Sequence, residues 1–287
     1  FATLSRAFDY YAEAGNIVQA VAAAEFPIAP PLNPMPGLAQ LISRALSLVP
    51  ADSHEAGRLL SRYGGVLAGA EADYEGAQQA LDQAATIARR VGDVRLETRT
   101  LAYACAASAH HLHWQESVNN GLRAIELAAG EENSYPEYLS RFWTLVSLIL
   151  MGDLDGARPH ALVLRDLADR RSTPRQQSFS ILMLLTSLSI VEGDWKAARE
   201  YSDRSLELVP LSPELLTPRA LLEHETGGSA QGQVYLERLL EFRRRAGEKG
   251  GRPAGMTSIA IARIARITGD PDLLEVAEAA AEELLSD

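Results

Sequence analysis

Three histidines and a glutamate stand close together at positions 110, 111, 113 and 116, and imidazole and carboxylate groups are common zinc ligands. A zinc site needs three or four converging ligands with a second shell of hydrogen bonds behind them. No cysteine or further acidic residue lies at a ligand-like spacing, and a helix is expected to end between His110 and His113. We interpret His110, His111, His113 and Glu116 as polar residues at a helix end, and we expect neither a metal nor a cofactor.

Motifs typical of other catalytic sites are missing from the sequence. It contains no Gly-x-x-x-x-Gly-Lys-Ser/Thr loop for phosphates, no Gly-x-Ser-x-Gly elbow and no His-Glu-x-x-His pair. The glycines between Gly247 and Gly251 lack the phosphate-loop pattern and predict a loop between helices. The single cysteine, Cys105, stands among alanines, which favours a buried thiol acting as a small apolar side chain. We therefore predict that the protein is not an enzyme, the weaker alternative being an enzyme that uses the histidine group.

The charge of the chain argues against direct binding of nucleic acid. Its formal net charge is −11, the opposite of what a phosphate-coating surface needs. The densest basic run consists of Arg243, Arg244, Arg245, Lys249 and Arg252. Because only one aromatic residue lies beside this run, we interpret it as a solvated helix end, with an anionic partner as the alternative.

Compartment and context can also be predicted. The longest apolar runs, 142–151 and 181–191, fall short of the roughly 20 residues that cross a bilayer, so no membrane contact is expected. One cysteine allows no internal disulfide framework, which fits a reducing, cytoplasmic location. Phe1 stands within what already looks like a helix, so we expect the sequence to be part of a longer polypeptide.

A hairpin of two helices joined by a short turn recurs along the chain, and these helices must position any functional side chains. At Gly193-Asp194-Trp195 the glycine can end one helix in the left-handed conformation, and the aspartate can cap the next. The residue after the cap, the anchor, is Tyr74, Trp114, Leu154 and Trp195 in successive copies, at separations of 40, 40 and 41. A small residue follows each anchor three positions later. This period predicts an all-α fold, a right-handed solenoid of helical hairpins.

Alignment on the anchors predicts the core. Eleven residues before the anchor the side chains are large: Tyr63, Tyr103, Trp143 and Leu184. Thirteen residues after it they are aliphatic: Ile87, Leu127, Leu167 and Leu208. The next residue is Ala88, Ala128, Ala168 or Val209. Large side chains on one helix can fill the gaps left by small ones on its neighbour, so these positions predict the contact between paired helices.

We expect one repeat domain over 1–287, with a partial first hairpin at 1–25, a proline-rich connector at 26–37, regular repeats at 38–209 and looser repeats at 210–287. The regular helices are expected at about 54–70 and 75–91, 94–111 and 115–129, 136–151 and 155–170, and 174–192 and 195–208. The later helices are expected at about 213–226, 230–246, 255–268 and 271–285, with a flexible loop over 247–253.

These motifs resemble tetratricopeptide repeats with a period longer than the usual ~34 residues. The resemblance rests on Gly15-Asn16, Asp73-Tyr74, Gly152-Asp153, Gly193-Asp194, Gly269-Asp270 and the helix end Ile87–Asp93. The longer repeat is similar to the repeat region of large bacterial signal-transduction ATPases. These include LuxR-type transcription activators related to the maltotriose-dependent activator, and multidomain nucleotide cyclases. The resemblance implies a sensor and interaction surface that works with ATPase and output domains of the same polypeptide. His113 replaces the aspartate of the turn, and the connector interrupts the register.

The first helix of each pair in such a fold lines a concave groove. On that basis the candidate binding residues are Arg99, Tyr103, Tyr138, Arg141, Gln176, Gln177 and Arg219. Arginine and aromatic side chains suit a surface that binds a peptide, a partner protein or a small anionic effector. For Tyr103 a purely structural role stays open, because it also occupies a core position.

Our hypothesis is a non-enzymatic sensor and interaction domain of a multidomain bacterial transcriptional regulator, which binds an effector or partner protein in its groove. Two alternatives remain: a protein–protein scaffold without small-molecule input, and the repeat region of a multidomain nucleotide cyclase.

Overall fold

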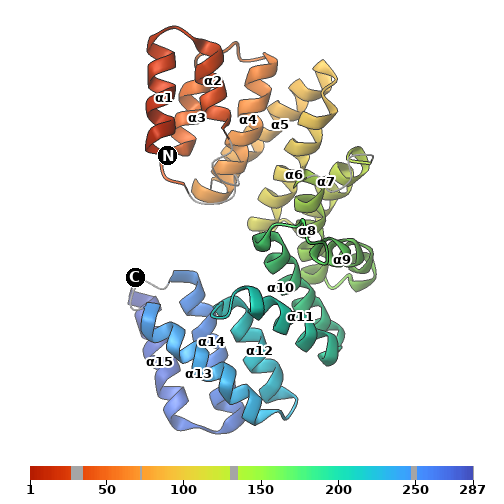
Figure 1. Cartoon of the computed structure of the whole chain (residues 1–287), viewed down its shortest axis with the longest axis vertical. Helices are drawn as coiled ribbons and strands as arrows, with labels where there is room; N and C mark the ends of the chain where they lie inside the picture. Colours follow the sequence, from red (N-terminus) through yellow and green to blue (C-terminus); the bar gives the residue numbers. More distant parts are fainter. Residues whose placement is uncertain (27–34, 72, 130–134, 247–250, 287) are drawn as a thin grey trace. The chain divides into compact units, whose positions relative to one another are not determined.

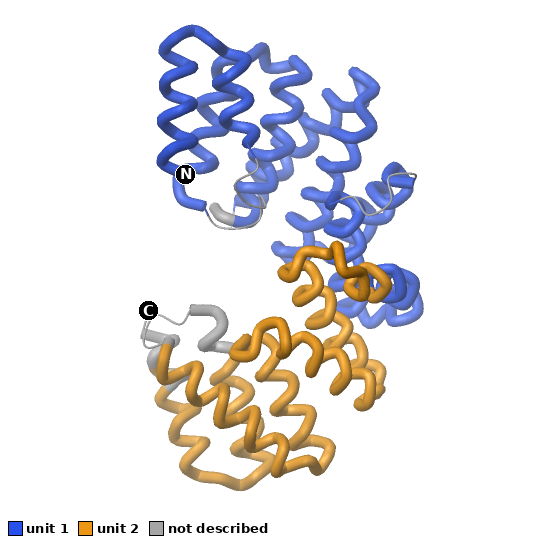
Figure 2. Tube along the Cα trace, in the orientation of Figure 1, with its two compact units in different colours: residues 1–164 blue, residues 165–287 orange. Residues whose placement is uncertain are grey.

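The computed structural model describes residues 1–26, 35–71, 73–129, 135–246 and 251–286, and all regular secondary structure in these ranges is helical (Figure 1). The predicted all-α class is thereby confirmed. The chain divides into two compact units, residues 1–164 and 165–287 (Figure 2). Within the described ranges, no helix is long and apolar enough to span a membrane.

Unit 1 contains four helical hairpins and an additional helix before the second hairpin. Its helices are α1 (Ala2–Glu13), α2 (Ile17–Glu25), α3 (Leu38–Leu46), α4 (His54–Val66), the π-helical turn η1 (Leu67–Glu71), α5 (Tyr74–Val91), α6 (Val94–His110), α7 (Trp114–Leu127), α8 (Tyr135–Met151) and the first part of α9 (Leu154–Ala168). Unit 2 follows with α10 (Arg175–Glu192), α11 (Trp195–Leu208), α12 (Pro213–Glu225), α13 (Ser229–Ala246), α14 (Gly251–Thr268) and α15 (Pro271–Ser286).

The glycine–aspartate corners work as their residue types predict. Gly193 ends α10 with φ +76°, a conformation that a residue without a Cβ adopts at little cost. The Asp194 carboxylate then accepts a hydrogen bond of 3.0 Å from the Ala197 backbone N–H at the start of α11. Asp73 caps α5 in the same way, at 2.9 Å from the Gly76 N–H. The Gly193-Asp194 corner therefore supplies both a helix stop and a helix start, whereas the Asp73 corner, with alanine before it, supplies the start alone.

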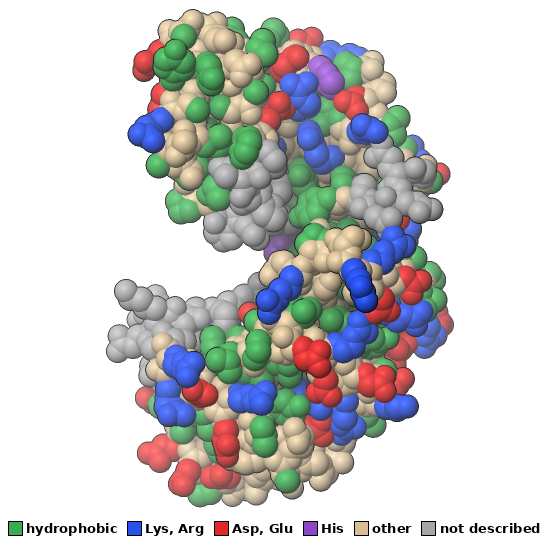
Figure 3. Space-filling view, viewed as in Figure 1, with side chains coloured by type: hydrophobic (Ala, Val, Ile, Leu, Met, Phe, Trp, Pro, Cys, Tyr) green, Lys and Arg blue, Asp and Glu red, His purple; other side chains and the backbone are tan. Residues whose placement is uncertain are grey.

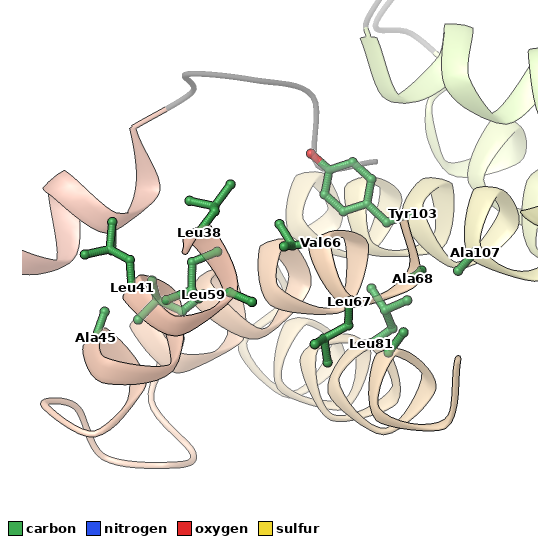
Figure 4. Packing of buried hydrophobic residues seen from close by; sticks show 14 of the residues in the cluster. Leu38, Leu41, Ala45, Leu59, Val66, Leu67, Ala68, Leu81, Tyr103 and Ala107 are labelled. Atoms are coloured by element: carbon green, nitrogen blue, oxygen red, sulfur yellow. The ribbon is translucent and has the colours of Figure 1, made fainter. Parts of the chain in front are cut away.

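The small residue three positions after each anchor is fully buried. Ala77, Ser117, Ala157 and Ala198 all have 0% exposure. A larger side chain there would hold the paired helices apart, so these positions explain the tight hairpins. The main core of unit 1 runs from α1 to α8 and includes Leu59, Leu67 and Leu81 (Figure 4). The core of unit 2 is built around Leu215, Leu236 and Ile261.

Two local predictions need correction, and a third falls largely outside the described residues. Helix α4 ends at Val66 and continues as a π-helical turn rather than as α-helix to residue 70, with the Asp73 N–H bonded to the Leu67 carbonyl at 3.1 Å. Helix α14 begins at Gly251, inside the loop predicted over 247–253, and the remaining loop residues 247–250 lie outside the described residues. Most of the predicted connector, residues 27–34, also lies outside them.

The turn between α6 and α7 departs from the repeat. Leu112 takes φ +66°, the single described non-glycine residue with positive φ, at the place where other corners have glycine. His113 occupies the cap position without a side-chain hydrogen bond to the helix. The turn thus keeps the backbone path of a glycine–aspartate corner without its two favourable residues.

Candidate functional site

Helices α4, α6 and α8 of unit 1 bring a set of arginine and tyrosine side chains together. Arg58 and Arg62 lie one turn apart on α4, and Arg99 and Tyr103 lie one turn apart on α6. Tyr135 and Tyr138, from the first turn of α8, pack against the same core cluster as Tyr103. We call these six residues the arginine–tyrosine face: Arg58, Arg62, Arg99, Tyr103, Tyr135 and Tyr138.

Glu25 at the end of α2 holds one side of this face in place. Its carboxylate accepts hydrogen bonds from Arg58 Nε at 2.7 Å and Arg58 Nη2 at 3.3 Å. Its backbone carbonyl accepts a bond from Arg62 Nη1 at 2.9 Å. Arg99 Nη2 in turn donates to the Arg58 carbonyl at 3.4 Å. Of the three arginines, only Arg58 has a carboxylate as a direct partner within the described residues.

Several guanidinium donors of the face have no acceptor among the residues that the structure describes. Arg62 Nε and Nη2 and Arg99 Nε are buried from solvent and have no hydrogen-bond partner among the described residues. A buried donor that makes no hydrogen bond costs about 1–3 kcal/mol, and more when it is charged. A group of such donors on two adjacent helices is therefore a place where an added acceptor would be strongly favoured.

The electrostatics of the face fit an acceptor that carries negative charge. Burial lowers the pKa of Arg62, and the nearby charge of Arg99 lowers it further. By contrast, the hydrogen bond to Glu25 raises the pKa of Arg58. An anion beside Arg62 would raise the pKa of Arg62, as Glu25 raises that of Arg58.

The tyrosines supply a half-apolar wall beside the arginines. Burial raises the pKa of Tyr103, and it raises that of Tyr135 to about 12, so both phenols are neutral donors at physiological pH. The Tyr103 ring stands beside Val66 with its hydroxyl directed away from the leucines of the core (Figure 4). The rings of Tyr135 and Tyr138 lie 5.9 Å apart. Aromatic rings next to cationic donors are suited to bind apolar and acidic side chains together.

The face holds no group poised for covalent chemistry. The nearest thiol, Cys105, is fully buried between Ser117 and Thr144, and burial raises its pKa to about 11. Its predicted role as a small buried side chain is confirmed. A thiol with a raised pKa is a poor nucleophile.

The four predicted binding residues of unit 1 have different surroundings. Arg99, Tyr103 and Tyr138 belong to the arginine–tyrosine face. Arg141 lies one turn beyond Glu137 on α8 and pairs with it at 2.9 Å, and both side chains are largely buried. The structure thus brings three of these residues together and engages the fourth in a local ion pair.

The three predicted residues of unit 2 do not form a comparable group. On α10, Gln176 is exposed and Gln177 is half-buried. Arg219 on α12 is 4% exposed; its Nε donates to Glu223 at 2.8 Å and its Nη1 to Asp203 at 2.7 Å. The guanidinium also lies over the Tyr235 ring, 4.8 Å from the centroid. The expectation that Arg219 lines an open groove therefore does not match its burial, because neighbouring helices already satisfy it.

Sequence reasoning missed Arg58 and Arg62. They precede Arg99 and Tyr103 by 41 residues each, one more than the period of 40 between the anchors Tyr74 and Trp114. Projecting the candidates one repeat toward the N-terminus reaches Leu59 and Tyr63, the residues that directly follow Arg58 and Arg62. What the sequence could not show is that the Glu25 carboxylate pairs with Arg58, whereas Arg62 bonds the Glu25 backbone carbonyl.

The histidine group lies at the corner between α6 and α7. The His113 ring stacks on the Tyr74 ring at 4.6 Å, and the Tyr74 hydroxyl donates to Glu116 at 2.8 Å. Among the residues that the structure describes, no three His, Cys, Asp or Glu side chains converge as metal ligands would. The side chains of this group instead pack and hydrogen-bond across the corner.

Comparison with known proteins places the fold. No protein-family model and no curated protein sequence matches the chain. The solved structure of the apo form of RapI is 12% identical, with a TM-score of 0.61, over 100% of this chain and 99% of that one. A Rap protein complexed with competence and sporulation factor is 14% identical, with a TM-score of 0.58, over 97% of this chain and 72% of that one.

A third structure, a tetratricopeptide repeat protein from Parabacteroides merdae ATCC 43184, is 11% identical with a TM-score of 0.51, over 96% of this chain and 98% of that one. At such identities the likeness concerns the fold alone. The protein therefore has a tetratricopeptide-like helical-repeat fold, as the turn motifs predict.

Proposed function

We infer that the protein is a non-enzymatic sensor and interaction domain whose arginine–tyrosine face binds an acidic peptide segment. The observation that carries this inference is the set of buried donors on Arg62 and Arg99 that have no hydrogen-bond partner in the described part of the chain. A carboxylate placed between them would accept charge-assisted hydrogen bonds, which are about twice as strong as neutral ones. The tyrosines beside them would contact the rest of the segment.

The fold supports this inference. Helical-repeat proteins present the side chains of successive helices as one extended surface. One protein of similar fold was solved in complex with a ligand, competence and sporulation factor. Binding of a segment across α4, α6 and α8 would link three helices of different hairpins, and so would alter the packing between repeats.

The wider role follows from the turn motifs rather than from this face. We infer that the domain acts within a bacterial regulator of the LuxR-type class and passes the binding signal to ATPase and output domains of the same polypeptide. A scaffold that responds only to a folded protein partner is the second candidate, and its test is the same screen carried out with short peptides.

The experiment uses three fluorescent pools of random octapeptides, enriched in acidic, neutral or basic residues, and measures anisotropy with the full 287-residue chain. The acidic pool is expected to bind, and Arg62→Met with Arg99→Met should weaken this binding at least tenfold. Arg204→Met is the matched control, because Arg204 forms an exposed ion pair with Asp169 in unit 2. Equal binding of the acidic pool to wild type and double variant, or preference for the basic pool, would refute the proposed function.

A further inference from the structure

Unit 2 contains a cavity of about 690 Å³ beside Trp195, and none of its lining residues belongs to the arginine–tyrosine face. Its walls come from the end of α10, the start of α11, α12 and α14. Ile190, Trp195, Pro218, Leu221 and Leu222 form the apolar part. Ligand sites for small molecules usually have volumes of about 300–1,000 Å³ and mainly apolar walls with a few polar groups. This cavity meets both criteria.

Comparison of two repeats explains why the cavity exists. The anchor Tyr74 of α5 is covered by rings from the following corner, His111 at 4.8 Å and His113 at 4.6 Å. Trp195 is the equivalent anchor of α11, and the corner that follows is Thr226-Gly227-Gly228. Two glycines supply no side chain to cover the indole, and Trp195 stays 42% exposed. The corner that follows Trp195 thus has no counterpart of the two rings that cover Tyr74.

One end of the cavity is polar and balanced in charge. Arg263 of α14 forms an ion pair with Glu225 at the end of α12. Nearby, Arg199 binds Glu223 through two bonds of 2.9 Å and donates to the Thr226 hydroxyl at 2.7 Å. Two guanidinium groups therefore face two carboxylates, and neither sign is in excess. This balance disfavours a strongly charged ligand and offers both a donor and an acceptor.

From these contacts we propose that the Trp195 cavity binds an uncharged, planar, fused-ring molecule with a hydrogen-bond donor and an acceptor on one edge. The ring stacks on the Trp195 indole in place of the rings that cover Tyr74. The apolar walls on α10 and α12 contact the rest of the ring system. The polar edge meets Glu225 as acceptor and Arg263 as donor.

The test titrates the full chain with quinazolin-4-one, a neutral bicyclic compound with an adjacent N–H and C=O, and follows the indole N–H resonances of the three tryptophans by NMR. The Trp195 resonance is expected to shift saturably, while those of Trp114 and Trp143 stay in place. Naphthalene has a similar shape and no polar edge, and it should bind at least tenfold more weakly.

The matched variant is Trp195→Leu, because Leu154 is a natural leucine anchor at the same place in the preceding repeat. This variant should keep the wild-type melting temperature within a few degrees and bind quinazolin-4-one at least tenfold more weakly in ligand-observed NMR. Binding unchanged by Trp195→Leu, equal shifts of all three indoles, or no saturation would overturn the proposal. So would tighter binding of N-acetyl-tryptophanamide, which would assign the cavity to a side chain of a partner protein. Since the peptide assay reports on Arg62 and Arg99 in unit 1, the two proposals can fail separately.

Discussion

Arg219 in unit 2 and Arg62 in unit 1 are both buried wholly or in part on the first helix of a hairpin, but their surroundings differ. Arg219 donates to Glu223, to Asp203 and to the Arg199 carbonyl, and it lies over Tyr235. Among the described residues, Arg62 has the Glu25 carbonyl as its one hydrogen-bond partner, and its Nε and Nη2 make no hydrogen bond there. A buried cation with a full set of partners holds a fold together. One with unused donors is available to a ligand.

The surface of unit 2 also carries charged side chains of both signs. Acidic and basic side chains are interspersed over the face of unit 2 in view (Figure 3). Unit 2 also has exposed ion pairs, such as Arg204 with Asp169. Exposed pairs of this kind contribute little to stability. The difference between the two units therefore lies in their buried polar residues, and substitutions of those residues test it.

The largest effect is expected for Arg219→Met. Removal of one partner from a buried ion network leaves charge uncompensated and costs about 3–5 kcal/mol. Because Arg199 also holds Glu223, we expect a loss near the lower figure, measured as a shift of the urea midpoint by circular dichroism. Arg204→Met, on an exposed pair, should lose less than about 1 kcal/mol. Equal losses for the two variants would show that Arg219 does not hold unit 2 together.

A second test extends the comparison to a histidine of unit 1. His160 is buried, its Nδ1 has no partner among the described residues, and burial lowers its pKa, with the charge of Arg141 lowering it further. Below about pH 6.5 the His160 imidazole therefore binds a proton in the unfolded chain but not in the folded chain. Stability should fall with decreasing pH by at most about 1.4 kcal/mol per pH unit from this group, until the folded-state pKa is passed.

His160→Leu should remove that contribution. Urea denaturation at several values between pH 7 and pH 5 measures the difference between the two proteins. The stability of the variant relative to wild type is expected to rise as the pH falls through this window. A constant difference would mean that His160 titrates alike in both states.

The corners offer a smaller test of the same contrast between the units. Leu112 in unit 1 holds φ +66°, whereas Gly193 in unit 2 meets the same demand with φ +76° and no side chain. The left-handed conformation costs a residue with a Cβ about 1–2 kcal/mol, of which the greater flexibility of glycine in the unfolded chain cancels part. Leu112→Gly should therefore stabilise the protein by up to about 1 kcal/mol. A lower thermal midpoint for this variant would be the opposite of what the backbone geometry requires.

The smallest effect on stability is expected at the arginine–tyrosine face itself. Arg62→Met removes a cation whose unused donors are a cost to the folded state, and the apolar stem is kept. We expect its free energy of unfolding, measured by urea denaturation, to match that of wild type within about 0.5 kcal/mol or to exceed it. This is the range of ordinary surface substitutions. A loss similar to that of Arg219→Met would show that Arg62 is a structural residue.

The hairpins could be predicted because their determinants are local. Gly193 and Asp194 fix a corner whatever surrounds them, and the small residue after each anchor is buried because paired helices touch there. Leu112 and His113 follow the same path without those determinants, since the packing of α6 against α7 imposes it. The proposed binding face includes three of the residues that the sequence suggested, Arg99, Tyr103 and Tyr138.

The rest of the site depends on contacts between helices distant in sequence. Arg219 could be paired with Glu223 from their spacing on one helix, but its burial depends on Asp203 and Tyr235 from α11 and α13. The unused donors of Arg62 follow from the position of Glu25, 37 residues earlier. The repeat pattern of the sequence does not show with which of two arginines a single carboxylate pairs.

The most direct measurement follows the arginine Nε–H resonances of the full chain by NMR during titration with the peptide acetyl-Glu-Glu-Glu-amide at constant ionic strength. The resonances of Arg62 and Arg99 are expected to move together and to saturate, while those of Arg199 and Arg219, which already have carboxylate partners, stay fixed. Uniform small shifts of all four arginines, or shifts at Arg219 with none at Arg62, would contradict the assignment of the unused donors as the binding site.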